Sequence, residues 1–378
     1  IEMFTGSLSD AEWFFGEADE LYRSLGDERG MAYIEQHRAW ISFLSGDLVL
    51  ARERLNHAAG MHSQFGDRNG VGWAYGLLAF IEFFERRFDE AENLAVTVSR
   101  EAELRGDEWA AGMMDTLRAD LRLWQGRLEE AHDLAEKART RFKRLNDRFG
   151  LVQAMAPLVR SQIALGRFAA SQRTSEELST IADTGTLGAF PLMALAGAAM
   201  HRGNGAAAAT MADRAIEAMD ANGGVPLEPN VVRSIALVQL DQVDEALIAI
   251  ESVLDAAGDH PFTRAAAALV FMAAGRPEQA LEHAQSVAHT DGATYLDEVF
   301  AYVGAAGAHA QMDDFAQAEL SAQAAVARAI GTGDVVATAL ATSAYRAVTG
   351  RAHPAYDDRT QLGEGWERVV NLLERRLR

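Results

Sequence analysis

The stretch FLSGDLVLARERLNHAAGMHSQFGD, residues 43–67, carries a Gly-Asp pair near its start and another at its end, with helical, alanine-rich spacing between them. The same phrase returns every forty residues in the first half of the chain. Each copy has a glycine or polar residue at a turn and a small residue five positions later. The pairs are Gly6/Ala11, Gly46/Ala51, Arg86/Ala91, Gly126/Ala131, Gly166/Ser171, Gly203/Ala208, Asp241/Ala246, Gly275/Ala280, Asp313/Ala318 and Gly350/Ala355.

A second set of turns repeats in step with the first, at Gly26-Asp27, Gly66-Asp67, Gly106-Asp107 and Asn146-Asp147. Two series of turns that repeat with the same period predict a unit of two helices. Each helix is expected to end at a residue that can take the left-handed conformation. One such hairpin cannot bury its apolar face alone, so neighbouring hairpins are expected to stack on one another.

The turn Gly-x-[Phe/Leu]-x-x-Ala, with small residues seven positions before it and five after it, resembles the tetratricopeptide repeat. The forty-residue period and closings such as Leu25-Gly26-Asp27 are similar to the C-terminal repeats of bacterial signal-transduction ATPases, which include large LuxR-type and antibiotic-regulatory transcriptional activators. The resemblance covers residues 1–350. We therefore expect an all-α, right-handed α-solenoid, or superhelix, of about nine helical hairpins with a C-terminal capping helix.

The regularity of the repeats changes along the chain. Residues 1–180 are aromatic-rich and keep the forty-residue period, residues 181–350 are alanine-rich and more degenerate repeats of the same superhelix, and residues 351–378 are expected to form the capping helix. The chain opens on Ile1, and residues 1–4 are expected to end a helix that begins upstream. The resemblance implies a nucleotide-binding domain and an output domain in that upstream part.

The composition excludes several classes of protein. The 55 acidic residues outnumber the 35 lysines and arginines, giving a formal net charge of −20. Such a surface repels phosphate backbones, so direct nucleic-acid binding is not expected. The chain has no cysteine, no apolar run near the roughly 18 residues of a membrane span and no signal peptide. We expect a cytoplasmic protein without disulfides or a membrane partner.

No stretch of the sequence predicts catalysis. Phosphate-binding and hydrolase motifs are absent, and the pairs His57/His62 and His283/His289 are five and six residues apart, not the four that a helical metal site requires. The pattern favours a protein that is not an enzyme and that has no cofactor and no metal site.

Aromatic residues are concentrated in the first 124 positions, which hold five of the six tryptophans. The resemblance implies that first helices line the concave face of the superhelix. The residues expected there as a ligand- or partner-binding groove are Tyr33, Trp40, Phe43, Trp73, Phe80, Phe83, Asp120, Trp124 and Arg160. The alternative is that these aromatic side chains form core between stacked helices.

Two further features have a functional and a structural interpretation. Lys137, Arg141, Arg144 and Arg148 form a basic stripe on one second helix, which either receives an acidic partner or is a solvated face. The residues Trp366, Val369, Val370, Leu373 and Leu377 share one face of an amphipathic C-terminal helix. That face either caps the array or forms a dimer contact.

Taken together, the sequence predicts a non-catalytic sensor or scaffold domain of a cytoplasmic bacterial regulatory protein. Its concave face would bind a peptide, a protein, the domains upstream of Ile1 or a small-molecule effector, and so control transcription or signalling. A free-standing adaptor for protein–protein interaction is the alternative, and an enzyme built on the solenoid is a third. The ligand, the biological pathway and the oligomeric state, including a homo-oligomer, stay open.

Overall fold

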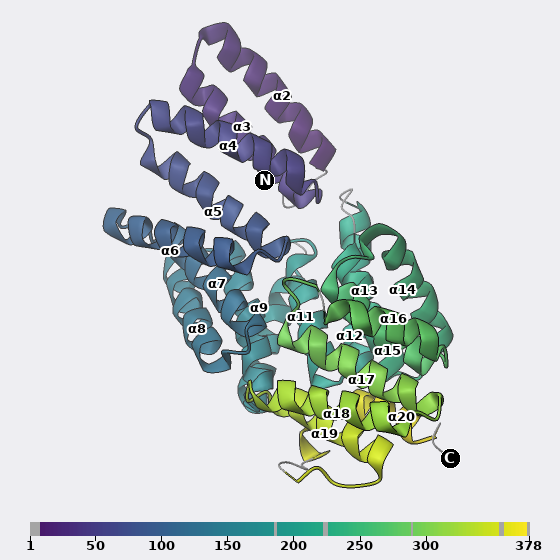
Figure 1. Cartoon of the computed structure of the whole chain (residues 1–378). Coiled ribbons are helices and arrows are strands. Elements are labelled where there is room, and N and C mark those ends of the chain that lie inside the picture. The colour runs from purple at the N-terminus through teal and green to yellow at the C-terminus, as the bar shows by residue number, and fades with distance from the viewer. Residues whose placement is uncertain (1–7, 185–186, 222–225, 289, 355–358, 376–378) are drawn as a thin grey trace.

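The computed structural model of the 378-residue chain describes residues 8–184, 187–221, 226–288, 290–354 and 359–375 (Figure 1). Every regular element in these ranges is a helix. Several residues used in the sequence argument lie outside the described residues, namely 1–4, Gly6, His289, Ala355 and Leu377.

The helices alternate between first and second members of a hairpin. The first helices are α3 (Glu28–Leu44), α5 (Arg68–Phe84), α7 (Glu108–Trp124), α9 (Arg148–Ala164), α11 (Phe190–Arg202), α13 (Leu227–Gln239), α15 (Pro261–Ala273), α17 (Tyr295–Gln311) and α19 (Val335–Thr349). The second helices are α2 (Leu8–Leu25), α4 (Leu48–Gln64), α6 (Phe88–Arg105), α8 (Leu128–Leu145), α10 (Phe168–Ala182), α12 (Gly205–Ala221), α14 (Val243–Ala257), α16 (Pro277–Val287) and α18 (Phe315–Ile330). A 3-10 turn, η1 (Arg359–Gln361), and α20 (Glu364–Arg375) complete the described part.

The turn chemistry explains why the helices begin and end at these positions. Gly46 adopts a φ of 82° between α3 and α4, a conformation that glycine takes without a Cβ clash. Asp47 then caps α4, because its carboxylate accepts a hydrogen bond from the N–H of Leu50. Asp67 does the same for α5 through the N–H groups of Asn69 and Gly70. The Gly-Asp phrase is therefore a helix stop followed by a helix start.

Small residues allow neighbouring helices to cross closely. Ala39 and Ala51 face each other within one hairpin, Ala79 and Ala91 within the next, and all four are fully buried. Each hairpin packs on the following one, so the described residues contain eight complete hairpins from α3 to α18. The all-α helical repeat fold is confirmed, and in its first half the hairpins follow the forty-residue period of the sequence.

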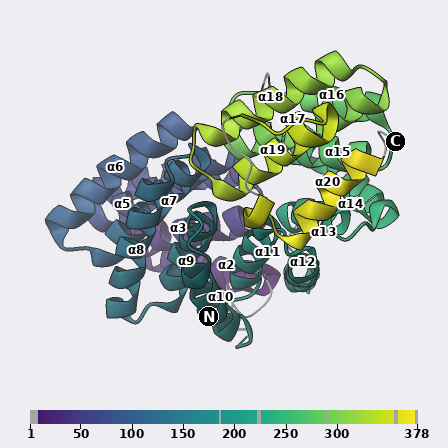
Figure 2. The ribbon, with the colours of Figure 1, turned by 90° about the horizontal axis from the view of Figure 1, so that it is seen from below.

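The array curves far enough for its second half to meet the turns of its first half (Figures 1 and 2). Arg86, in the turn between α5 and α6, donates hydrogen bonds to the carbonyl oxygen of Gly292 (3.3 Å) and to Asp297 Oδ2 (3.2 Å). Arg86 stands where most repeats have glycine and still adopts a positive φ of 62°. The turn at Gly126 lies against Thr332. The superhelix is thus closed by contacts between residues about 200 positions apart.

Helix α20 packs against α19 and also reaches α13 and α15, which are first helices (Figure 2). Trp366 is 1 % exposed, and its Nε1–H donates to the carbonyl oxygen of His201 at 2.9 Å. Val369, Val370 and Leu373 are also buried. Among the described residues of this apolar face, for which a dimer contact was the alternative, all four are therefore buried within this chain.

Candidate functional site

The first helices of the N-terminal hairpins carry an aromatic wall. Trp40 on α3 lies 5.6 Å from Trp73 on α5 and 5.9 Å from Phe149 on α9, between ring centroids. Phe149 in turn meets Phe190 on α11 edge-to-face at 5.5 Å. These contacts join the first helices of four hairpins, α3, α5, α9 and α11.

The wall encloses a cavity of about 110 Å³. An engineered apolar cavity of about 150 Å³ is known to hold benzene, so this space is of the order of one aromatic ring. The aromatic residues that line the cavity are Trp40, Phe43, Trp73, Phe80, Phe83, Phe84, Trp109, Phe149 and Phe190. These side chains are partly buried or exposed, not fully buried, so the cavity is open to solvent.

Two polar side chains also line this cavity. Asp120 on α7 and Gln153 on α9 belong to its lining. Arg160, two turns further along α9, places its guanidinium carbon 4.4 Å from the ring centroid of Trp124. Stacking on an indole ring is a favourable position for a guanidinium group. The inner face therefore passes from an apolar cavity to a charged zone.

The charged zone contains two carboxylates that influence each other. Burial raises the pKa of Asp120 to about 7, with Arg160 acting in the opposite direction and Glu228 adding to the rise. Glu228 is accessible to solvent, but the protein around it desolvates the carboxylate and so raises the pKa of Glu228, which Arg160 and Arg86 counteract. Glu228 lies in the first turn of α13, on another part of the superhelix, so this zone is assembled only by the curvature of the array.

Six of the nine residues predicted for the groove line the cavity, namely Trp40, Phe43, Trp73, Phe80, Phe83 and Asp120. Trp124 and Arg160 lie in the adjoining charged zone. Tyr33 is in neither place: its side chain is 47 % exposed and its hydroxyl donates to Asp67 Oδ2 at 3.2 Å. Binding by any of these residues stays a prediction.

Four aromatic residues of the cavity lining were not predicted from the sequence, namely Trp109, Phe149, Phe190 and Phe84. The first two share one position of the forty-residue register, two residues after the turn aspartates Asp107 and Asp147. That register was a usable signal. Phe190 had none, because the period is lost before α11 and its place against Phe149 follows from the stacking of α11 on α9.

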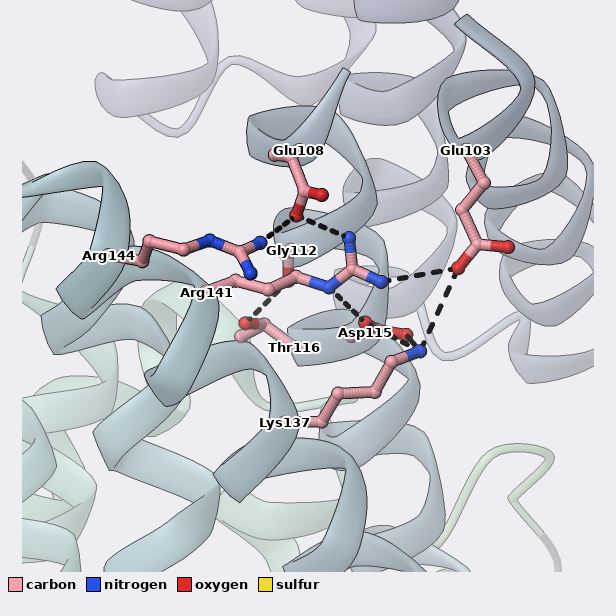
Figure 3. Close-up of polar contacts among 8 residues, drawn as sticks. All are labelled: Glu103, Glu108, Gly112, Asp115, Thr116, Lys137, Arg141 and Arg144. Carbon is pink, nitrogen blue, oxygen red and sulfur yellow. Dashed lines mark hydrogen bonds and ion pairs between the residues drawn. The ribbon is translucent and has the colours of Figure 1, made fainter. Parts of the chain in front are cut away.

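The predicted basic stripe forms ion pairs within the chain (Figure 3). Arg141 contacts Glu108 at 2.9 Å and Glu103 at 3.3 Å, and Lys137 contacts the buried Asp115 at 3.0 Å. Burial raises the pKa of Asp115 even though Lys137 acts against it.

The two remaining arginines of the stripe also have partners. Arg144 pairs with Glu108 at 2.6 Å, and Arg148 donates to Thr184 Oγ1 at 3.2 Å. The acidic residues of neighbouring helices therefore balance much of the charge of the stripe.

Within the described ranges, no group of three or more His, Cys, Asp or Glu side chains is arranged to hold a metal ion. Over the same residues, no helix combines the length and apolar character of a membrane span.

Solved structures with a similar fold are tetratricopeptide-repeat proteins and signalling proteins. The apo form of the quorum sensor NprR from B. thuringiensis is 13 % identical, and the match covers 83 % of this chain and 91 % of that one with a TM-score of 0.48. A tetratricopeptide repeat protein from Parabacteroides merdae is 14 % identical over 72 % of this chain and 98 % of that one, with a TM-score of 0.42.

A third similar structure is a signal transduction ATPase with numerous domains, from Pyrococcus horikoshii, which has a tetratricopeptide repeat sensor. It is 14 % identical, and the match covers 92 % of this chain and 53 % of that one with a TM-score of 0.36. No protein-family model and no curated protein matches the sequence. Two of these three structures are described as containing tetratricopeptide repeats.

Proposed function

We propose that this chain is a non-catalytic binding module whose aromatic cavity receives a bulky apolar side chain of a partner protein or peptide. The observation that carries the proposal is the open cavity of about 110 Å³ between Trp40, Trp73 and Phe149. Apolar pockets with a few polar groups at one end are typical ligand sites. Aromatic anchors in such pockets supply much of the affinity of protein interfaces.

The hairpin array suits a sensor or scaffold. Each hairpin contacts its neighbours, so a ligand that bridges α3, α5 and α9 would favour one curvature of the superhelix over another. In a cytoplasmic bacterial regulator, that change would pass to the domains that the resemblance places upstream of Ile1. A ligand produces this shift only if it binds the two curvatures with different affinities.

The binding claim is tested with 3-methylindole, the side chain of tryptophan, titrated by calorimetry. For ten non-hydrogen atoms, we expect a Kd of about 1 mM or tighter. Gly76→Leu, which fills the cavity from α5, should weaken this binding about tenfold or more. Trp40→Ala combined with Trp73→Ala should abolish binding of a tryptophan-containing peptide while helicity is retained.

The matched control is Trp13→Ala, because Trp13 lies on α2 and does not line the cavity. It should bind 3-methylindole as the wild-type chain does. Unchanged binding by Gly76→Leu, or no binding by the wild-type chain, would contradict the proposal.

The regulatory role is separated from that of a free-standing adaptor by the reading frame upstream of Ile1. A nucleotide-binding motif encoded there would support the sensor. A start codon immediately upstream would support the adaptor and remove the proposed regulatory output, without changing the binding claim.

A further inference from the structure

The zone beside the aromatic cavity carries more negative than positive charge. Among the described residues, neither Asp120 nor Glu228 has a side-chain hydrogen bond or an ion pair within 4 Å, and both interact with Arg160 only at longer range. Arg160 therefore acts on both carboxylates, and Arg86 acts on Glu228 as well. Arg160 itself stacks on Trp124, and its Nε has no hydrogen-bond partner.

The remaining charged groups nearby do not correct this imbalance. Arg86 approaches Glu228 but is engaged with Asp297 and Gly292. The Glu228 side chain is accessible to solvent, and protein atoms also lie around it. We therefore place it in the solvent-filled interior of the superhelix. A ligand that enters from that interior meets both carboxylates.

The position of Asp120 joins this charge to the cavity. Asp120 is part of the cavity lining together with Trp40, Trp73 and Phe149. An aromatic ring in the cavity thus brings the next group of the same ligand toward Asp120. Burying a carboxylate without a partner is unfavourable, and a cation placed there removes that penalty.

We propose that the cavity and the two carboxylates form one composite site, which recognises a peptide segment of a partner protein in which an aromatic residue adjoins an arginine or lysine. This inference rests on the proposed function and names the chemistry of its partner. Charge complementarity selects the basic neighbour: Asp120 and Glu228 attract a guanidinium or ammonium group and repel a carboxylate. Burial raises the pKa of Asp120 to about 7, and Arg160 only partly offsets this rise.

The test compares two peptides that differ in charge alone. One is acetyl-Gly-Trp-Arg-Gly-amide, and the other carries citrulline, the neutral isostere of arginine, in place of arginine. Titration by calorimetry at pH 8 should show that the arginine peptide binds at least about tenfold more tightly, as close charge pairs at interfaces do. Equal affinity of the two peptides would overturn the inference.

Protein variants identify the carboxylates responsible. The double variant Asp120→Asn and Glu228→Gln should bind both peptides with the affinity that the wild-type chain shows for the citrulline peptide. The matched control is Asp89→Asn, an exposed carboxylate in the first turn of α6. It should keep the preference for arginine. A preference that survives in the double variant would also overturn the inference.

A pH series adds a second readout. Asp120 faces Arg160 on α9 and Glu228 on α13, and protonation of Asp120 removes the charge that attracts the ligand. The preference for arginine over citrulline should therefore fall as the pH is lowered from 8 to 5.5. A preference that is constant over this range would contradict the role of Asp120.

Two further outcomes separate this inference from its premise. If both peptides bind equally and Gly76→Leu abolishes both, the aromatic cavity is a binding site and the charge recognition is wrong. If neither peptide binds, the proposed function fails together with the inference. Tryptamine tests the assignment to a peptide, because binding of this free amine as tight as that of the arginine peptide would assign the site to a small aromatic amine.

Discussion

The two halves of the superhelix use the same first-helix face in opposite ways. In the N-terminal half, that face is an aromatic wall around an open cavity. In the C-terminal half, helix α20 lies against α13, α15 and α19 and covers it. The side chains explain the difference. Gly307 on α17 has no side chain and lies directly against Leu373 of α20.

A residue without a large side chain lets another helix approach closely. Large aromatic rings keep neighbouring backbones apart and leave space between them. The C-terminal half thus shows one way in which the inner face can be filled: by an amphipathic helix with a buried tryptophan, Trp366, as its anchor. The N-terminal half has no such occupant among the described residues. This contrast favours a ligand site in the N-terminal half.

The largest difference between the two halves is expected from the substitution Trp366→Ala. Removing a fully buried tryptophan from the contact with Phe300 and His201 should lower the free energy of unfolding of the C-terminal half by about 3–5 kcal/mol. Amide hydrogen exchange should show faster exchange in α11–α19, with α4–α8 little changed, because hairpins report mainly on their neighbours. An equal loss of protection along the whole chain would mean that α20 does not serve the C-terminal half alone.

The next largest loss of stability is expected at Asp334, whose side chain contacts residues of other hairpins. Asp334 caps α19 through the N–H groups of Val336 and Ala337, accepts from the hydroxyl of Tyr295 at 2.8 Å, and lies 2.9 Å from His201 Nε2. Asp334→Asn should lower the free energy of unfolding at pH 7 by about 1–3 kcal/mol, because it leaves buried donors poorly paired.

The pH dependence of that effect has a defined sign. Burial acts to raise the pKa of Asp334, but His201 and the hydrogen bonds outweigh it, so the pKa lies below its usual 3.8. The stabilisation is present above about pH 4 and is lost as the pH falls through the lowered value. Urea unfolding of both proteins between pH 7 and pH 3 should show the difference narrowing. A constant difference would contradict the ionised state of Asp334.

A smaller effect of opposite sign is expected in the open half. The pKa of Asp120 is raised from 3.8 to about 7, so its contribution to stability is fully present below about pH 4 and is lost as the pH rises through 7. Asp120→Asn cannot ionise and should be more stable than the wild-type chain at pH 8, by about 1 kcal/mol, a gain typical of relieving a functional residue. The two should be equal at pH 4. If Asp120→Asn were less stable than the wild-type chain at pH 8, the ionised Asp120 would be stabilising the fold.

The smallest effect is expected on the outer face. Arg144 is exposed and pairs with Glu108, which also pairs with Arg141. Exposed ion pairs contribute little, so Arg144→Ala should change the free energy of unfolding by less than about 0.5 kcal/mol. A loss above 1 kcal/mol, measured by urea unfolding, would require a structural role for the basic stripe that its exposure does not suggest.

The spacing of turn residues was sufficient to predict much of this molecule. Gly46, Asp47 and Ala51 each act within one hairpin or at its contact with the next, so the forty-residue period alone implied the hairpins, their caps and their stacking. It also placed Trp40, Trp73 and Phe80 on one face. The aromatic register at Trp109 and Phe149 was equally visible in the sequence.

The contacts between distant parts of the chain were decided by the tertiary structure alone, because they join residues that share no position of the sequence repeat. Arg86 meets Asp297 across 211 positions, Glu228 comes near Asp120 from another part of the superhelix, and α20 turns back into the array. All three depend on the accumulated curvature of many hairpins. Small rotations between neighbours add up along a solenoid, and a local pattern does not contain their sum.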